Sequence, residues 1–468
     1  MNRRRTAPEL VENVDIIDIS NEGAGVGKKD GKVIFVDGAV PGDIVNTMVF
    51  KNKKDWASGK LHEIIHASNN RIEAACRHFG LCGGCKWQHL NYDAQLQFKQ
   101  KFVVDAFERI AKVPYQNRHE ILGSEKIFEY RNKLEFSFSA SRWLEKSEIE
   151  QTEILNKSAL GFHIPGRFDK VFQVQECKLM PDFNNQVRNF VHEQAQLLTI
   201  PYFDLKHQTG NLRSLMMRQS NQNEWLILLS AFERNDLVNE LLNSIAKQFP
   251  EITALLFVEN KKRNETIFDL PIEIVHGKDH IVEKMGELSF KISAKSFFQT
   301  NSRQAQLLYD KVVNFAALSG NEVVYDLYTG TGTIANFLAS KAKKVIGLEY
   351  VADAVNDAIA NSESNKIENT VFVAGDMKDV LTQTLFSEHG KPDVIITDPP
   401  RAGMHEAVID RLLEAEAPLI IYVSCNAATQ ARDAALLHAK YDITHLQPVD
   451  MFPHTTHVEN IAVFRLRN

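Results

Sequence analysis

The sequence predicts an α/β protein whose Rossmann-like C-terminal domain follows a small N-terminal β-barrel and a central, mainly β domain of the α+β type. Three observations lead to this fold class. The chain has 468 residues, more than one hydrophobic core usually organises. Short β-rich runs alternate with Gly and Pro turns near the N-terminus, and apolar runs in the last third each end in polar residues. We place the three domains at residues 1–69, 70–292 and 293–468.

The composition is that of an ordinary globular protein, with 44% hydrophobic residues and a formal net charge of -6. The longest apolar runs, such as "APLIIYV", are too short to span a bilayer, and no apolar segment follows the basic N-terminal end. Five unevenly spaced cysteines are too few for a secreted disulfide framework. We therefore expect a cytoplasmic protein with no membrane partner. The acidic balance also argues against nonspecific coating of nucleic acid.

The first domain contains the stretch "VDIIDISNEGAGVGKKDGKVIFVDGAVPGDIVNTMVF", which is typical of a small five-stranded barrel. Through Ser68 it has ten Lys and Arg against ten Asp and Glu, so a phosphate-binding face has to come from local groups. Those groups could equally be solvated surface. They are Arg3 to Arg5, Lys28 with Lys29, and Lys51 to Lys54.

The second domain is expected to be built around an antiparallel sheet, because strand-like segments such as "KLEFSFSA" and "EWLILLS" recur in it without a long linker or repeat. Arg131 and Lys133, in "YRNKLEF", are candidates for contacts with an RNA backbone. They could equally be ordinary charges on a strand surface.

A cluster of thiols also lies in the second domain, in "ACRHFGLCGGCKWQHL". Cys76, Cys82 and Cys85 have the spacing C-x5-C-x2-C, which chance seldom produces. Cys177 is the candidate fourth ligand, since the remaining cysteine lies in the last domain. Four thiolates could bind zinc or an iron–sulfur cluster. One tight trio with a single remote cysteine favours the cluster without deciding between the two.

The third domain opens with "VVYDLYTGTGTIANFLASKAKKVIGLEYVADAV", which indicates a buried strand, a glycine-rich turn, a helix and a second strand. Gly330 and Gly332 permit a tight turn and close approach of a ligand, and Glu349 could bind ribose hydroxyls. The same letters satisfy the dinucleotide pattern G-x-G-x-x-A. A nicotinamide-dependent dehydrogenase therefore stays an alternative.

Two later strand ends favour S-adenosyl-L-methionine over a nicotinamide cofactor. "TVFVAGD" brings Asp376 to the edge of the sheet, and "KPDVIITDPPRAG" brings Asp398, followed by two prolines that make a stiff loop. Such a loop could hold a planar base against a methyl donor.

Cys425 follows the next apolar run, in "APLIIYVSCN", and is expected at the same edge of the sheet. A thiolate that adds to carbon 6 of uracil makes carbon 5 nucleophilic enough to attack a methylsulfonium. A base must then remove the proton of carbon 5 so that the thiolate can leave. Glu459, in "MFPHTTHVENIAVF", is the best candidate for this base. His454 and His457 are alternative bases, but a role in shaping the loop suits them better. Desolvation would be needed to raise the pKa of Glu459.

These residues together resemble the RNA uracil-C5 methyltransferase family, specifically its iron–sulfur branch that acts on 23S ribosomal RNA. The resemblance covers nearly the whole chain and makes the first domain similar to a TRAM domain, an OB-like RNA-binding module. It implies that Cys425, in "SCN", is the nucleophile and that Glu459, in "HVE", is the proton acceptor. It implies that a 4Fe-4S cluster is bound by Cys76, Cys82, Cys85 and Cys177.

The resemblance also assigns the contacts with S-adenosyl-L-methionine. They map to Gln299 in "SFFQTN", Tyr328 in "DLYTGTG", Glu349 and Asp398. The glycine loop departs from the family, because Thr329 and Thr333 stand where members often carry Cys and Asn. Its backbone role is unaffected, whereas contacts through these two side chains are left open.

The predicted activity is S-adenosylmethionine-dependent methylation of 23S rRNA at uracil C5, of the uridine-1939 type in conventional ribosomal numbering. The target base would be splayed out of the RNA and lie between Cys425 and Asp398. Because methyl transfer moves no net electrons, it needs no redox centre. The cluster is therefore expected to stabilise its domain and to shape the surface that contacts RNA. We expect a monomer with RNA, most directly 23S rRNA, as partner and no DNA. The alternatives are a tRNA or dual-site uridine methyltransferase, and a catalytically silent iron–sulfur RNA-binding protein.

Overall fold

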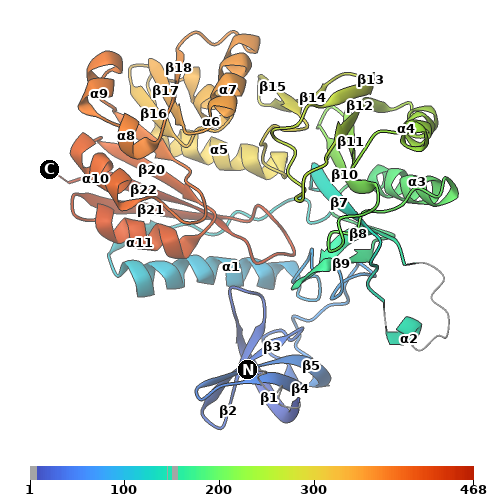
Figure 1. Cartoon of the computed structure of the whole chain (residues 1–468). Helices are drawn as coiled ribbons and strands as arrows, with labels where there is room; N and C mark the ends of the chain where they lie inside the picture. Colours follow the sequence, from blue (N-terminus) through green and yellow to red (C-terminus); the bar gives the residue numbers. More distant parts are fainter. Residues whose placement is uncertain (1–7, 145, 150–156, 468) are drawn as a thin grey trace.

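The computed structural model describes residues 8–144, 146–149 and 157–467 and has three parts (Figure 1). A barrel lies at one end, a largely antiparallel sheet with its helices lies beside a larger α/β unit, and helix α1 (Tyr92–Ala106) runs between the barrel and that unit. In the described part of the chain, no helix is both long and apolar enough to cross a bilayer.

The N-terminal strands close into a barrel in the order β1-β2-β3-β5-β4, as the alternation of apolar runs and turns predicts. Its core is a small set of aliphatic side chains, among them Val14, Ile34 and Val45, each at most 3% exposed. The predicted basic group Arg3 to Arg5 lies outside the described residues. The strands are β1 (Glu9–Ile19), β2 (Gly25–Lys29), β3 (Lys32–Asp37), β4 (Ile44–Asn52) and β5 (Trp56–His66).

The central part is a seven-stranded sheet in the order β13-β12-β11-β10-β7-β8-β9, in which β11 and β12 pair in parallel and the other pairs are antiparallel. Helix α4 (Asp236–Gln248) packs an apolar face at helical spacing onto the core of this sheet, and Asn235 caps its first turn. The other elements are α2 (Lys146–Ile149), α3 (Phe183–Leu197), β7 (Lys133–Ser139), β8 (Ala159–Ile164), β9 (Arg167–Gln173), β10 (Leu212–Gln219), β11 (Trp225–Ala231), β12 (Ile252–Glu259) and β13 (Glu273–Gly277).

The C-terminal part is an eight-stranded sheet in the order β18-β17-β16-β19-β20-β22-β21-β6. Alternate residues of its parallel strands face two different cores: Val324 belongs to one and Tyr325 to the other. Burial on both faces explains why these strands read as continuous apolar runs. The strands are β16 (Val323–Leu327), β17 (Lys344–Glu349), β18 (Thr370–Ala374), β19 (Val394–Thr397), β20 (Leu419–Ser424), β21 (Tyr441–Val449) and β22 (Glu459–Leu466).

Helices lie on both faces of this sheet, as in the predicted Rossmann-like arrangement (Figure 1). They are α5 (Ser302–Ala316), α6 (Thr333–Ala339), α7 (Ala352–Ser364), α8 (Met377–Val380), α9 (Gln383–His389), α10 (Glu406–Ala415) and α11 (Ala427–Leu437). A two-stranded ribbon, β14 (His280–Met285) with β15 (Leu288–Ser293), precedes α5.

Residues 92–118 pack against the C-terminal sheet, although the predicted boundaries group them with the central domain. Helix α1 continues into a π-helical turn, η1 (Phe107–Ala111), and then into β6 (Tyr115–Arg118). Strand β6 pairs with β21 and forms the edge of the eight-stranded sheet. Trp87 and Phe102 are buried in a small core that also contains Ile19 and Val40 of the barrel region.

Candidate active site

Four of the predicted site residues lie at one edge of the C-terminal sheet because they follow parallel strands in register. Leu327 at the end of β16 pairs with Leu348 of β17 and Thr397 of β19, and Thr397 pairs with Tyr422 of β20. The carboxyl ends of these strands therefore meet at the edge where open α/β sheets bind ligands. The side chains at or just after these ends are Tyr328, Glu349, Asp398 and Cys425.

The glycine loop after β16 allows a ligand to come close to its backbone. Gly330 and Gly332 have φ values of 56° and 74°, in the left-handed region that favours glycine. A Cβ at Gly332 would lie 2.8 Å from the Cβ of Ala358. Glu349 accepts hydrogen bonds from Gly330 N (3.0 Å) and Val351 N (2.9 Å), one on each carboxylate oxygen. Because each oxygen has a second acceptor position, the carboxylate can still bind hydroxyl groups.

Thr329 turns toward the buried end of β16. Its hydroxyl donates to Asp326, a side chain that is 0% exposed. Burial raises the pKa of Asp326 to about 7 despite that hydrogen bond. Its other oxygen, Oδ1, is buried and has no partner among the described residues. Sequence reasoning did not single out Asp326, although a carboxylate near the end of an apolar strand in "VVYDLYTG" is a usable signal.

Glu459 lies beside Cys425 because β22 is inserted antiparallel next to β20, with Ser424 opposite Asn460. Glu459 is 6% exposed, and burial, reinforced by the charge of Asp398, raises its pKa to about 8. Burial raises the pKa of the Cys425 thiol, and the charges of Glu459 and Asp398 raise it further. Burial also raises the pKa of Asp398 to about 7. The site therefore favours the neutral forms of these acids and makes a nearby cation important.

Arg401 is that cation, and sequence reasoning missed it. It lies in "DPPRAG", three residues after Asp398, and a lone arginine there resembles an ordinary surface charge. Its guanidinium hydrogen-bonds to the thiol of Cys425 and lowers the pKa of that thiol, and its charge lowers the pKa of Glu459. Its Nη2 lies 3.2 Å from Nδ1 of His457. Arg401 thus links the predicted nucleophile to the loop that precedes the predicted base.

Of the other predicted residues, His454 is 2% exposed and lies 3.2 Å, Nδ1 to Nε2, from Gln95 of α1. This position agrees with a role in shaping the loop. Gln299 lies between β15 and α5, and its backbone carbonyl accepts a hydrogen bond from Asn132 (2.8 Å). Its contact with a cofactor stays a prediction.

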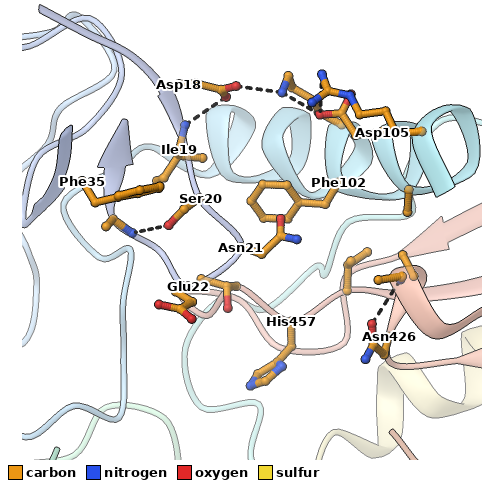
Figure 2. Close-up of a pocket in the computed structure, with 18 of the residues that line it drawn as sticks. Asp18, Ile19, Ser20, Asn21, Glu22, Phe35, Phe102, Asp105, Asn426 and His457 are labelled. Atoms are coloured by element: carbon orange, nitrogen blue, oxygen red, sulfur yellow. Dashed lines mark hydrogen bonds and ion pairs between the residues drawn. The ribbon is translucent and has the colours of Figure 1, made fainter. Parts of the chain in front are cut away.

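A cavity of about 1180 Å³ connects this site to the N-terminal barrel (Figure 2). Cys425, Asn426 and His457 line one end, and barrel side chains that include Phe35 line the other. Phe102 of α1 lies between these ends, and Asp18 and Asp105 both bind Lys101 at the rim. The cavity also contacts Lys51, Trp56, Arg109 and Arg401.

The four remaining cysteines come together in the central part, around a second cavity of about 100 Å³. All four are free thiols. Burial, reinforced by the neighbouring sulfurs, raises the pKa of Cys85 to about 12 and that of Cys177 to about 11. Thiolates at such a site need a positive partner. Among the described residues, no group of three or more His, Cys, Asp or Glu is arranged to hold a single metal ion.

Two cations, half-buried Arg131 and buried Arg188, adjoin this cysteine site. Arg131 lines its cavity, and Nε of Arg131 is buried without a hydrogen-bond partner among the described residues. Arg188 is 0% exposed and lies close enough to Cys177 to affect the pKa of that thiol. The rest of the wall combines apolar side chains, such as Leu134 and Phe162, with Gln88 and the ion pair of Glu176 and Lys178. Four thiols beside Arg131 and Arg188 suit an anionic, thiolate-bound group larger than one ion.

Comparisons with known proteins agree with this geometry. Residues 91–467 match the family described as tRNA (Uracil-5-)-methyltransferase, and residues 11–61 match the TRAM domain. The chain belongs to the tRNA (uracil-5-)-methyltransferase family. It is therefore an enzyme of the RNA uracil-5-methyltransferase class, which confirms the predicted family and barrel type.

Individual relatives extend this likeness over the full length. An "Uncharacterized RNA methyltransferase" of Bacteroides thetaiotaomicron is 49% identical over 451 residues, 95% of this chain and 99% of the relative. Another, of Chlorobaculum tepidum, is 39% identical over 93% of this chain and 92% of its own length. The crystal structure of Pyrococcus abyssi tRNA (uracil-54, C5)-methyltransferase, in complex with S-adenosyl-L-homocysteine, is 27% identical and superposes with a TM-score of 0.75, covering 97% of this chain and 100% of that one.

Proposed function

We propose that this chain is an S-adenosyl-L-methionine-dependent 23S rRNA uracil-C5 methyltransferase of the uridine-1939 type, which forms 5-methyluridine. The observation that carries the proposal is the placement of a thiol, Cys425, close to both a buried carboxyl group, Glu459, and a cation, Arg401. Addition of a thiolate to uracil and later removal of a proton need those three kinds of group together.

When bound, S-adenosylmethionine would supply an electrophilic methyl group. Its proposed contacts are Gln299, Tyr328, Glu349 and Asp398. The free acceptor positions of Glu349 suit ribose hydroxyls, and the glycine loop leaves room for close approach of the cofactor. The S-adenosyl-L-homocysteine in the Pyrococcus abyssi enzyme supports a cofactor of this chemistry.

The Cys425 thiolate adds to C6 of uracil, and the electrons of the C5=C6 double bond become available at C5. C5 then forms a bond to the methyl group, and S-adenosylhomocysteine is released. Glu459 takes the remaining proton from C5, the double bond re-forms, and the S–C6 bond breaks to regenerate the thiolate. Arg401 favours the thiolate before addition and the carboxylate before proton removal, because its charge lowers the pKa of both groups.

The cavity between Cys425 and the barrel is the proposed path of the RNA strand. Its charged side chains have both signs, and Lys101 is already bound by Asp18 and Asp105. Nζ of Lys51 lies over the Trp56 ring, 4.6 Å from its centroid. The ring centroids of Trp56 and Phe35 are 6.1 Å apart. This composition suits stacked, unpaired bases better than a row of phosphates.

The cysteine site is proposed to hold a 4Fe-4S cluster through Cys76, Cys82, Cys85 and Cys177. The convergence of four thiols on one cavity and the buried Nε of Arg131 beside it support this proposal. Methyl transfer needs no electron from such a group, so its proposed role is structural. A monomeric, cytoplasmic enzyme that uses no DNA stays a prediction.

A uridine of tRNA is the second candidate target. It is favoured by the full-length similarity to an enzyme whose substrate is tRNA uracil-54. The deciding experiment is mass spectrometry of 5-methyluridine in separated 23S rRNA and tRNA, from cells with and without the gene. Loss confined to one 23S fragment supports the first target, and loss in tRNA supports the second. No loss in either RNA would contradict both.

A further inference from the structure

The predicted base, Glu459, is delivered by an irregular loop of residues 450–458 between β21 and β22. Elements outside the catalytic sheet hold this loop. At its start, Asn301 of the segment before α5 donates to Met451 O (2.9 Å), and buried Lys99 of α1 donates to Asp450 Oδ1 (2.6 Å) and Phe452 O (3.0 Å). The start of the loop is thus fixed by α1 and by the segment that precedes α5.

The middle of the loop is held instead by the cysteine site. The carbonyl of His454 accepts two backbone hydrogen bonds, from Lys86 N (2.7 Å) and Trp87 N (3.1 Å). These two residues directly follow Cys85, so the chain passes from a predicted cluster ligand to the catalytic loop within two residues. Trp87 is 0% exposed, which fixes that segment in a buried core.

A second connection runs through Tyr130 and Arg131, just before β7. Tyr130, 7% exposed, donates its hydroxyl to Pro453 O (3.0 Å). Arg131, the next residue, lines the cysteine cavity and lies over the ring of Phe452 at 5.6 Å. Two segments that adjoin lining residues of that cavity, Lys86 with Trp87 and Tyr130 with Arg131, therefore contact consecutive residues of the loop.

The side chain of Gln95, on α1, joins the two segments. Its Nε2 donates to Trp87 O (3.0 Å) and its Oε1 accepts from His454 N (2.9 Å). Gln95 is 0% exposed. Displacement of the Cys85–Trp87 segment would leave these buried polar groups without partners, which is costly, so that segment and the loop are expected to move together.

We propose that the cysteine site positions the catalytic loop: Lys86, Trp87 and Tyr130 hold residues 452–454 so that Glu459 meets the C5 proton. This inference rests on the proposed function. Loss of the group held by the cysteines then frees the middle of the loop and slows proton removal more than methyl transfer. Tyr130 is a positioning residue here, because it acts through the loop and not on the substrate.

Tyr130→Phe tests the contact without changing the cysteines. Tyr202→Phe is the matched control, because Tyr202 is also buried in the central part and its hydroxyl contacts His192 Nδ1 (2.8 Å), not the catalytic loop. In single turnovers with uridine tritiated at C5, we expect Tyr130→Phe to slow tritium release about tenfold. We expect it to change methyl incorporation less than twofold, to accumulate an SDS-resistant protein–RNA complex and to keep the metal content of the wild type. Equal slowing of both steps, or no difference from Tyr202→Phe, would overturn the proposal.

Hydrogen exchange gives a readout independent of activity. The full-length protein is compared before and after treatment with an iron chelator, and metal loss is measured. Amides of residues 450–458 are expected to exchange faster after treatment, while those of α10 are unchanged. Loss of metal with unchanged exchange in the loop would contradict the coupling. Absence of 5-methyluridine formation by the wild type would instead refute the proposed function and leave this exchange test valid.

Discussion

The sheet edge that carries Asp398, Cys425 and Glu459, here called the catalytic edge, and the cysteine site both place acidic groups where burial disfavours their charged forms. The two sites differ in the cation that offsets this effect. Both bury acidic groups near one another, and burial raises the pKa of Glu459 to about 8 and that of Cys85 to about 12. At the catalytic edge the cation Arg401 lowers the pKa values of Cys425 and Glu459, so we expect these groups to change protonation during a reaction. At the cysteine site, four thiols line one cavity, and their thiolates would need a positive partner. The catalytic edge therefore suits groups that gain and lose protons, whereas the cysteine site suits its proposed structural role.

Of the changes that distinguish the two sites, removal of the Cys425 thiol is expected to have the largest effect on activity. Cys425→Ala should abolish methylation and any covalent adduct, because no other thiol lines the catalytic cavity among the described residues. Methyl transfer from labelled S-adenosylmethionine to RNA measures this. Thermal unfolding should stay near that of the wild type, since the side chain is partly exposed. Retained turnover would show that Cys425 is not the nucleophile.

Removal of a cysteine ligand should instead affect metal content and stability first. Cys85→Ser is expected to lose iron and sulfide, to lose the broad visible absorbance of a thiolate-bound cluster, and to unfold at a lower temperature. Cys425→Ala is the matched control and should keep all three. Anaerobically purified wild type with stoichiometric zinc in place of iron would contradict the cluster assignment.

The pH dependence of the rate tests the cation at the catalytic edge. Because Glu459 must be ionised to accept the C5 proton and its pKa is about 8, the rate of proton removal should rise between about pH 6 and pH 9. Arg401→Gln removes a charge that lowers the pKa of Glu459 and Cys425, so the profile should move to higher pH. The loss should then be greater at pH 7 than at pH 9. Arg411→Gln, in the exposed ion pair with Glu414, is the control, and a pH-independent loss at Arg401 would contradict this role.

The barrel end of the catalytic cavity should contribute least. Trp56→Ala is expected to raise KM for RNA about tenfold with a small change in kcat, because one base-stacking contact is lost. Phe50→Ala is the matched control, since Phe50 is 52% exposed on the same barrel and does not line the cavity. Equal effects of the two variants would move the RNA path away from this cavity.

The sequence predicted the parts of the molecule in which local pattern determines position. Glu349, Asp398 and Cys425 each end an apolar run, and parallel strands bring such ends to one edge. The closeness of Glu459 to Cys425 depends on the antiparallel insertion of β22 beside β20, which no local pattern specifies. Arg401 was missed because only its surroundings distinguish it from a surface arginine.

Contacts between segments far apart in the chain could not be predicted from the sequence either. The four cysteines were predicted together from their spacing and number, but their connection to the catalytic loop was not. That connection consists of backbone contacts such as Lys86 N to His454 O, and backbone groups carry no residue-specific signal. Likewise, nothing local in the four-residue strand β6 indicates that it completes the edge of a sheet more than 300 residues later in the chain.

The most direct measurement of the proposed chemistry is mass spectrometry of the complex formed by Glu459→Gln with RNA and S-adenosylmethionine. Methyl transfer should proceed and proton removal should stall, since the amide cannot accept the proton. The expected product is an SDS-resistant adduct in which a C5-methylated uridine is bonded through C6 to the sulfur of Cys425. Free 5-methyluridine at the wild-type rate without an adduct, or an adduct at another residue, would contradict the proposed roles of Cys425 and Glu459.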